Sequence, residues 1–266
     1  MLRLVHLIRR KAGMSHTEFR DRWRDVHGSL VAAHQHDLDL VRYTQLHPDP
    51  ADQGLDRQAR AARGMEGEPF DGAAEYWWRS EEAFLSAVRS ERGQAAARLL
   101  ASRETDLIEN SSSPMWLAHE YPQVANGFQR PVARFRTGVM RLLFAFQALP
   151  TLTDDEARRY WLVEHGPLIR SHSAARGLLA YNQVHRVETA ALGAWPAARH
   201  VGAVPFLGYA ESWFDRLNAP SGPELEAAKQ AALSDERHFI DWTRATIIVG
   251  KECVFVERDW ASYGEY

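Results

Sequence analysis

Apolar and polar positions follow one another along the chain in a pattern that predicts the same series of elements twice. In the first half, the pattern predicts a strand at residues 2–8, a helix at 15–35, strands at 40–47 and 73–78, a helix from residue 80 and a strand at 115–120. The first helix begins at a capping box, in which Ser15 and Glu18 can satisfy the free amides of the first turn. Thr153 and Glu156 repeat this device in the second half. Each half therefore reads β-α-β-β-α-β.

An internal repeat relates the two halves residue by residue. Residues 23–28 (WRDVHG) align with residues 161–166 (WLVEHG), which lie 138 positions later. The same register pairs uncommon residues further along, namely His34 with His172, Tyr43 with Tyr181, Gln45 with Gln183 and His47 with His185. Past the first long loop the offset falls to 136 and pairs Trp77 with Trp213. We therefore expect one repeat at residues 1–121, a linker at 122–136 and a second repeat at 137–266.

The predicted order of elements is that of the ferredoxin-like split βαβ unit. Such a unit covers one face of a four-stranded sheet with two helices and leaves the other face bare. A duplicated chain supplies a partner for that bare face. We therefore predict an α+β protein in which two ferredoxin-like βαββαβ repeats pack sheet to sheet and close an α+β barrel within one chain.

The repeated motifs resemble those of the EthD family, which belongs to the dimeric α+β barrel superfamily. The most specific motifs are a helix with the pattern S/T-x-x-E…W-x-x-x-H-G and a strand with the pattern Y-x-Q-x-H, and each is present twice. The strand at residues 70–77, with the pattern F-D-G…E-x-W, also looks similar to that family, as does the segment at residues 235–241. The resemblance covers nearly the whole chain and implies an intramolecular version of the dimeric barrel.

The same resemblance implies a catalytically mixed set of activities. Proteins similar to this family act as cofactor-free dehydratases or decarboxylases on polyketide-like aromatics, and others accompany oxygenases in ether degradation. Neighbouring barrel families include lactone isomerases, polyketide cyclases, quinone-forming monooxygenases and haem-binding oxidoreductases. The two halves differ within the motifs, since Leu207 stands in place of Asp71 and Arg103 in place of Asp235. This is consistent with one half having drifted towards a structural role, and the fold alone does not choose among the activities.

Composition and charge exclude several classes of protein. The chain has 32 Lys and Arg against 35 Asp and Glu, so its net charge of -3 offers no field for nucleic acid and no basic face for an anionic membrane. Its single cysteine, Cys253, rules out an internal disulfide and a cysteine-based metal cluster, and fits a reducing compartment. No apolar stretch approaches the roughly 18 residues that a membrane span needs. We therefore expect a cytoplasmic protein that binds neither nucleic acid nor membranes.

Two histidines on the repeated helix, His27 and His165, are the first candidate catalytic residues. At 100° per residue, each shares a narrow stripe with a tryptophan and with a second histidine, and such a stripe faces the sheet. An unperturbed pKa of roughly 6.5 suits a histidine to general acid–base chemistry, although packing alone explains a buried histidine equally well. Tyr43 and Tyr181 complete the catalytic set, because a phenol can hold an oxygen that gains negative charge.

Side chains that alternate along the second strand of each half are candidate substrate-binding residues. Tyrosine, glutamine and histidine share one face there, and such a row is costly in a dry core unless its members are hydrogen-bonded. His6 on the first strand has Phe144 as its counterpart, which weakly favours the first half as the active one. The predicted substrate-binding residues are Gln45, Gln183, His47, His185, His34, His172, His6, Trp77 and Trp213. The connections at 48–69 and 187–205 are long enough to be lids or linkers.

The sequence lacks the motifs of several cofactor enzymes. There is no Gly-rich phosphate loop, nucleophile elbow or dinucleotide fingerprint, and no histidine pair has metal-ligand spacing on a helix, so we expect no metal and no other cofactor. The leading hypothesis is a cofactor-independent lyase, a dehydratase or decarboxylase, that acts on a small cyclic, aromatic or polyketide-like metabolite in an apolar barrel interior. Alternatives are an isomerase or cyclase, a haem- or oxygen-using oxidoreductase, and a non-catalytic protein that binds an apolar ligand for a partner oxygenase. We expect a monomeric pseudo-dimer or a weak homodimer.

Overall fold

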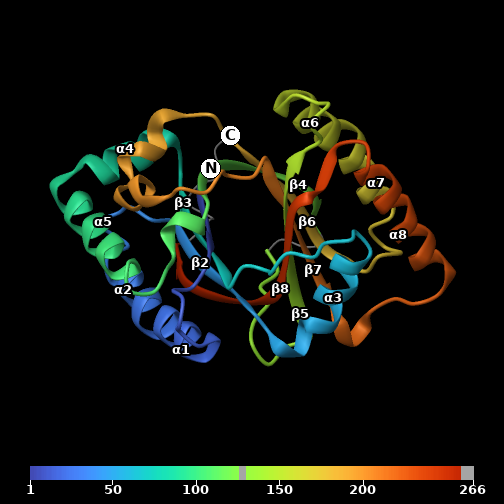
Figure 1. Cartoon of the computed structure of the whole chain (residues 1–266), viewed down its shortest axis with the longest axis horizontal. Coiled ribbons are helices and arrows are strands. Elements are labelled where there is room, and N and C mark those ends of the chain that lie inside the picture. The colour runs from blue at the N-terminus through green and yellow to red at the C-terminus, as the bar shows by residue number, and fades with distance from the viewer. Residues whose placement is uncertain (126–129, 259–266) are drawn as a thin grey trace.

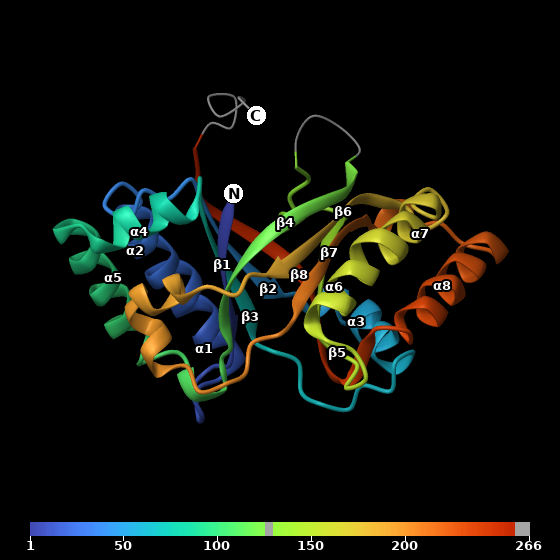
Figure 2. The ribbon, with the colours of Figure 1, turned by 90° about the horizontal axis from the view of Figure 1, so that it is seen from above.

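Eight strands close into one antiparallel barrel within the residues that the computed structural model describes, 1–125 and 130–258 (Figure 1, Figure 2). Their order around the barrel is β1-β3-β2-β8-β5-β7-β6-β4. The strands are β1 (Leu2–Ile8), β2 (Arg42–Pro48), β3 (Gly72–Trp78), β4 (Met115–Ala125), β5 (Val139–Ala148), β6 (Leu178–Arg186), β7 (Gly208–Asp215) and β8 (Ile240–Glu257). The α+β class and the closed barrel predicted from the sequence are confirmed.

Two long strands close the barrel by pairing across the halves. β4 pairs with β1 at its start and with β6 further on, and β8 pairs with β5 and then with β2. Each half therefore contributes four neighbouring strands, in the orders β4-β1-β3-β2 and β8-β5-β7-β6. Because β4 continues to Ala125, it takes up the first residues of the expected linker. Residues 126–129 of that linker and residues 259–266 lie outside the described part of the chain.

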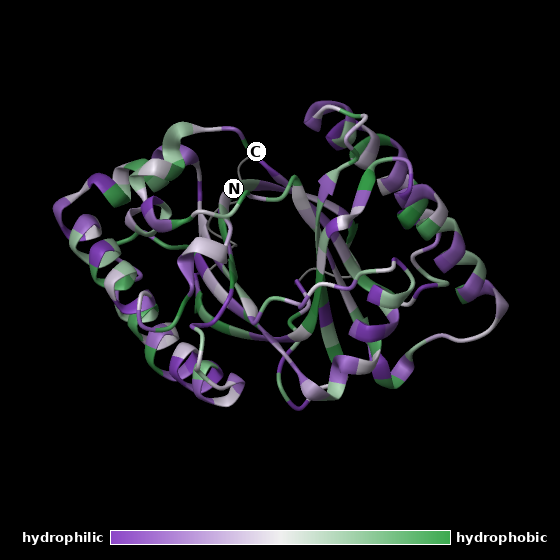
Figure 3. Cartoon of the chain, viewed as in Figure 1, coloured by the Kyte–Doolittle hydropathy of each residue, from purple (hydrophilic) through white to green (hydrophobic). Residues whose placement is uncertain are grey.

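Helices cover the outside of the barrel in two groups, one on each side (Figure 1). The first group is α1 (His16–Asp21), η1 (Arg22–Gly28), α2 (Ser29–Ala33), α4 (Glu81–Arg89) and α5 (Glu91–Glu104), and the second is α6 (Asp154–Tyr160), η4 (Trp161–His165), α7 (Gly166–Ser171) and α8 (Pro223–Glu236). Short 3₁₀ turns lie at η3 (Asn110–Ser112) and η7 (Arg216–Asn218). Figure 3 shows hydrophilic and hydrophobic residues interspersed along these helices, as expected when one face packs on a sheet. Among the described residues, no helix has the length and hydrophobicity that a membrane span requires.

Capping side chains begin both long helices. Ser15 Oγ accepts the N–H of Glu18 at 3.1 Å, but the Glu18 carboxylate lies 3.4 Å from Arg22 and does not complete the expected capping box. Thr153 and Glu156 form the complete, reciprocal box. Each long helix then passes through a π-helical segment, η1 or η4, before it continues as α2 or α7. These wider turns carry the candidate histidines.

The two long connections cross over and cover the opposite half of the molecule. The first contains η2 (Pro50–Asp52) and α3 (Gln53–Ala61), and α3 lies beside β5 and the second group of helices (Figure 1, Figure 2). The second contains η5 (Ala190–Ala194) and η6 (Pro196–His200), which lie beside α4 and α5. Each half is therefore covered by a segment that the other half supplies.

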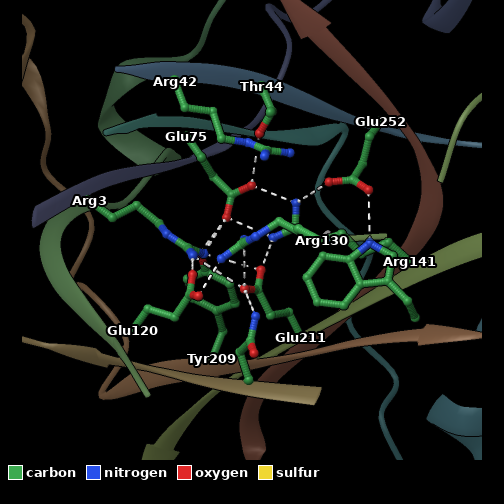
Figure 4. Close-up of polar contacts among 12 residues, drawn as sticks. Arg3, Arg42, Thr44, Glu75, Glu120, Arg130, Arg141, Tyr209, Glu211 and Glu252 are labelled. Atoms are coloured by element: carbon green, nitrogen blue, oxygen red, sulfur yellow. Dashed lines mark hydrogen bonds and ion pairs between the residues drawn. The ribbon is translucent and has the colours of Figure 1, made fainter. Parts of the chain in front are cut away.

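Part of the barrel interior holds a buried network of ion pairs (Figure 4), while an apolar cluster that includes Val5 and Leu143 fills another part, so the prediction of an apolar interior holds only in part. Arg141 donates to the two oxygens of Glu75 at 2.6 and 2.7 Å, and Arg3 donates to Glu75 and Glu211 at 3.1 Å each. Arg3 corresponds to Arg141 in the repeat, and Glu75 to Glu211, so each half supplies one arginine and one glutamate. Further members of the network are Glu120, Arg130, Tyr209 and Glu252.

Trp77 and Trp213 line this charged part of the interior. The Arg3 guanidinium lies 4.5 Å from the centre of the Trp77 ring, and that of Arg141 lies 5.2 Å from Trp213. The indole N–H of Trp213 donates to Glu252 at 2.9 Å. Strand alternation therefore places both tryptophans on the barrel side, opposite the helices. The prediction that they bind substrate is corrected, because ion pairs fill the space that they face.

Candidate functional site

The Tyr-Gln-His row of each half lies on the outer face of its sheet, beneath the helix that carries the repeated tryptophan and histidine. Gln45 Nε2 donates to the Trp23 carbonyl at 3.0 Å, and the ring of His47 lies 2.9 Å from Gln45 Oε1. Gln183 and His185 repeat these contacts in the second half, with the glutamine 2.7 Å from the carbonyl of Trp161. The row thus satisfies its own polar groups and fixes the helix on the sheet.

This role occupies the side-chain amides of two predicted substrate-binding residues, Gln45 and Gln183, and one ring nitrogen of each of two others, His47 and His185. The amides of Gln45 and Gln183 hold the helix, and His47 and His185 hold the amides. Burial lowers the pKa of each of these histidines to about 3, so both are neutral at physiological pH. The prediction that these four residues bind substrate is corrected on these contacts.

The π-helical segments change the direction in which the later histidines point. His34 and His172 stand at the ends of α2 and α7 and are partly exposed, and His34 Nδ1 lies 2.9 Å from Asp37. A stripe at 100° per residue assumes α-helical turns, whereas a π-helical turn contains an additional residue and rotates the next turns of the helix about its axis. The two histidines are therefore not on the sheet-facing stripe, and their predicted substrate contact is corrected.

A pocket of about 480 Å³ lies between the sheet and the helices of the second half. Its walls are mainly apolar, with Phe144, Phe146 and Phe214 from the sheet and Leu233 from α8. Residues of α3 form the side that the first half supplies. The polar residues of its lining include Arg63, His165, Arg176, Tyr181, Ser212 and Glu236. The structure thus brings the predicted pair His165 and Tyr181 together in one pocket, while none of the first-half candidates lines it.

His165 is held in a defined orientation at the wall of this pocket. Its Nδ1 lies 2.6 Å from Asp235 Oδ2 of α8, and the other carboxylate oxygen accepts the Tyr160 hydroxyl at 2.8 Å. Burial acts to raise the pKa of Asp235, but the hydrogen bonds from His165 and Tyr160 outweigh it, so the pKa is lowered. An ionised carboxylate only accepts hydrogen bonds, so Nδ1 is the protonated nitrogen and Nε2 is left for a ligand.

Tyr181 and Arg176 add a donor and a positive charge to the same pocket. The Tyr181 oxygen accepts the indole N–H of Trp161 at 3.3 Å, which leaves its own proton to donate. Burial raises the pKa of Tyr181 to about 12, so the phenol is neutral at physiological pH. Arg176 has no carboxylate within 4.0 Å among the described residues, whereas Arg63 of the crossing connection forms a two-pronged pair with Glu236 at 2.5 and 2.7 Å.

The corresponding space in the first half is filled. His27 lies beside Tyr43, with 3.5 Å between Nδ1 and the hydroxyl, and its Nε2 lies 3.3 Å from Glu104. Tyr76 takes the place that the small Ser212 has in the second half, and its ring lies 4.5 Å from that of Tyr43. The first half therefore holds the predicted pair His27 and Tyr43 in contact but without an open pocket. The weak preference for the first half as the active one is corrected.

Sequence reasoning missed the residues that complete the site. Asp235 and Glu236 were visible in the repeated segment near the end of each half, but nothing in their spacing places them beside a helix about 70 residues earlier. The difference between Arg103 and Asp235 was the available signal, because it leaves only the second half with an aspartate for its histidine. Arg63 was also missed, since a connection that crosses to the other half has no local signature. No group of three or more metal-ligating side chains occurs among the described residues.

The chain belongs to the EthD family. The model of the EthD domain matches residues 11–101 and again residues 149–243, so the family covers both repeats. A comparison with proteins of curated function finds no match. The match of the EthD domain model to both halves confirms the resemblance seen in the repeated motifs.

Three solved structures with a similar course of the chain have the names of oxidoreductases. A "putative monooxygenase" from Lactobacillus acidophilus has a TM-score of 0.47 and 7% identity, over 97% of this chain and 96% of that one. One of the same name from Fusobacterium nucleatum has a TM-score of 0.47 and 7% identity, over 96% and 91%. A mutant chlorite dismutase from Candidatus Nitrospira defluvii has a TM-score of 0.40 and 12% identity, over 96% and 91%.

The prediction of a cofactor-independent lyase is corrected, since none of the three printed names describes a dehydratase, a decarboxylase or an isomerase. The geometry also removes two premises of the lyase hypothesis. Ion pairs occupy part of the barrel interior, and the first-half pair of histidine and tyrosine faces no open pocket.

Proposed function

We propose that the protein is an enzyme, an oxidoreductase that uses oxygen and acts on a small ring compound in the pocket of the second half. The observation that supports this most is His165, oriented by Asp235 at the wall of a largely apolar pocket of about 480 Å³. Pockets of this size and character suit small organic ligands. A histidine with one nitrogen held and one free suits proton transfer to and from such a ligand.

The proposed reaction oxidises an activated ring methylene to a carbonyl, in the balance R₂CH₂ + O₂ → R₂C=O + H₂O. His165 takes a proton from the ring methylene, whose acidity comes from a conjugated carbonyl group in the substrate. Arg176 and the Tyr181 hydroxyl stabilise the negative charge that develops on the oxygen of that carbonyl. The anion gives its electrons to O₂, a C–O bond forms, and His165 returns the proton to the peroxide. Removal of the second C–H proton breaks the O–O bond and releases water. The substrate supplies all four electrons, so no external reductant is needed.

The test is oxygen uptake with a panel of substituted anthrones, which carry the activated ring methylene, followed by an oxygen electrode and by the absorbance of the quinone product. His165→Gln is expected to lower kcat about 10² to 10⁴-fold, the usual contribution of a positioned acid–base group. His172→Gln is the matched control, because it lies on the same long helix outside the pocket. A His165→Gln enzyme as fast as the wild type, or no uptake with any panel member, would overturn the proposal.

The same histidine favours haem binding as a second candidate. A metal-ligating histidine usually donates its other ring N–H to a carboxylate, as His165 does to Asp235. The side chains that line the pocket are of the types that hold haem. His165 would ligate the iron through Nε2. Phe144 and Phe214 would contact the porphyrin ring, and Arg176 would pair with a propionate. Haem would supply iron-based oxygen chemistry. Titration with haemin decides it: a Soret shift that His165→Gln abolishes and His172→Gln retains supports this candidate, and an unchanged spectrum rejects it.

The architecture supports a pseudo-dimer built by duplication. We infer that residues 1–121 and 137–266 are two ferredoxin-like repeats joined by residues 122–136, because each contributes four neighbouring strands in equivalent order. We also propose that the main binding partner is a small-molecule substrate. Because the two sheets already cover one another, we propose that the protein works as a monomer. Light scattering at working concentration tests this, and a stable dimer would contradict it.

A further inference from the structure

The first half contains a group of buried polar side chains that the proposed reaction does not use. His6, His27, Tyr76 and Glu104 are each at most 2% exposed. His27 Nε2 lies 3.3 Å from Glu104, and the charges of Glu104 and His27 both act on His6. Burial outweighs the carboxylate and lowers the pKa of His6 to about 4. The group is therefore one electrostatic cluster between the sheet and the helices of this half.

This cluster is short of hydrogen-bond partners. Both ring nitrogens of His6 have no hydrogen bond among the described residues, while His27, Tyr76 and Glu104 contact one another in a geometry that leaves their polar atoms only partly satisfied. A buried polar group without a partner costs about 1–3 kcal/mol, so native proteins rarely leave several together. A ligand that both donates and accepts hydrogen bonds would satisfy them.

Trp195 occupies the space that is open in the other half. Its indole is 1% exposed and lies 5.5 Å from the ring of Tyr76 and 6.0 Å from that of Trp78. Tyr76 and Trp78 correspond in the repeat to Ser212 and Phe214, which line the open pocket. Trp195 is thus an aromatic side chain seated in the first-half counterpart of a ligand pocket.

The segment that carries Trp195 lies at the surface and comes from the other half. Trp195 joins η5 to η6, which lie beside α4 and α5 in both ribbon views (Figure 1, Figure 2). A groove of about 650 Å³, lined by Leu85, Val88 and Ala194 among others, separates it in part from those helices. Thr189 Oγ1 anchors the start of the segment to Glu81 at 3.1 Å. A segment bordered by a groove can be displaced without opening the barrel.

We propose that the first half holds a second ligand site, closed here by Trp195, for a small aromatic compound that carries a hydroxyl group. The ring of the ligand replaces the indole beside Tyr76 and Trp78. Its hydroxyl reaches the cluster, where it donates to a ring nitrogen or to Glu104 and accepts from Tyr76. This site is separate from the proposed active site, so either proposal can fail while the other stands.

The first test uses Trp195→Ala, which removes the indole, and titrates it calorimetrically with indole and with the 4-, 5- and 6-hydroxyindoles. Because Trp195 no longer competes, we expect this site to bind at least tenfold more tightly than in the wild type, and at least one hydroxyindole to bind tenfold or more tightly than indole. Trp195→Ala combined with Glu104→Gln is expected to lose that preference. Equal affinity for indole and all three hydroxyindoles, as for a plain void, would overturn the proposal, and so would binding by a folded variant that is no tighter than binding by the wild type.

The second test uses the wild-type protein and does not depend on the folding of a variant. Hydrogen exchange of the amides at 190–198 is measured with and without the same hydroxyindole at saturation. Because the ligand must displace Trp195, exchange in this segment is expected to rise at least severalfold, while the crossing helix α3 is unaffected. Unchanged exchange at 190–198 would show that the site does not open and would overturn the proposal.

Discussion

Arg141→Met tests the ion-pair network at the centre of the barrel. Arg141 is 1% exposed and pairs with three glutamates, Glu75, Glu211 and Glu252. Methionine fills part of the side-chain volume but leaves these carboxylates with less positive charge. Breaking a buried pair by removing one partner costs about 3–5 kcal/mol, because the remaining charge stays buried. At roughly 2–3 °C per kcal/mol for a domain of this size, the expected fall in Tm is about 6–15 °C.

The assay is urea unfolding at pH 7, with Arg22→Met as the control for an exposed ion pair. Arg22 and Glu18 are about half exposed, so this control is expected to cost less than 1 kcal/mol. Adding Glu211→Gln to Arg141→Met removes one negative charge from a network in which Arg3 and Arg130 are then the remaining cations, and is expected to restore part of the loss. A cost below 1 kcal/mol for Arg141→Met, or a double variant weaker than the single one, would refute the reasoning.

The pH dependence gives the same experiment a second readout. Burial acts to raise the pKa of Glu75, but Arg141 and Arg3 outweigh it and hold the pKa well below its usual range. A carboxyl group with a lowered folded pKa stabilises the fold above its unfolded pKa of about 4.3, and this contribution is lost as the pH falls. The gap between the wild type and Arg141→Met is therefore expected to narrow below about pH 4. A gap that stays constant there would assign the cost to packing.

Three further substitutions test other parts of the structure. The pKa of His6 is about 4 in the folded state and 6.5 in the unfolded state, so the wild type loses stability as the pH falls from 6.5 to 4. His6→Phe should remove up to about 3 kcal/mol of this loss. Urea unfolding at pH 4 and pH 7 measures it. Gly250→Ala would press a Cβ against the backbone carbonyl of His47 and should cost more than about 2 kcal/mol in the same assay. Ser212→Tyr copies Tyr76 into the second half and should weaken ligand binding in the open pocket at least tenfold by calorimetry, with the Tm unchanged within a few degrees.

The fold was predictable from the sequence because each motif occurs twice, and the second copy confirms the elements that the first one indicates. A single WxxxHG helix is a weak signal, but two in register with two Tyr-Gln-His strands indicate two equal units. The apolar strands at 2–8 and 73–78 then need a partner sheet, and the second unit supplies it. Element bounds agreed to within a few residues, except that β4 and β8 extend further because they pair with both halves.

The site was predictable only in part, because its geometry depends on long-range packing. His165 and Tyr181 share a pocket as expected, but the π-helical segment turned His172 away from the sheet. Arg3 and Arg141 lie within apolar runs, so periodicity marked their strands but not the ion pairs that they form across the barrel. The crossing of the two long connections has no signature in composition or spacing.

The asymmetry between the halves explains why only one pocket is open. Both halves place a histidine of the long helix beside a carboxylate, Asp235 for His165 and Glu104 for His27. The volume around the pair differs, since Ser212 is small where Tyr76 is large. The covering segment differs as well, because η5 and η6 insert the indole of Trp195, whereas α3 leaves the space beneath it open. The covering segment of each half belongs to the other, so the side chains of one connection decide whether the opposite site is open.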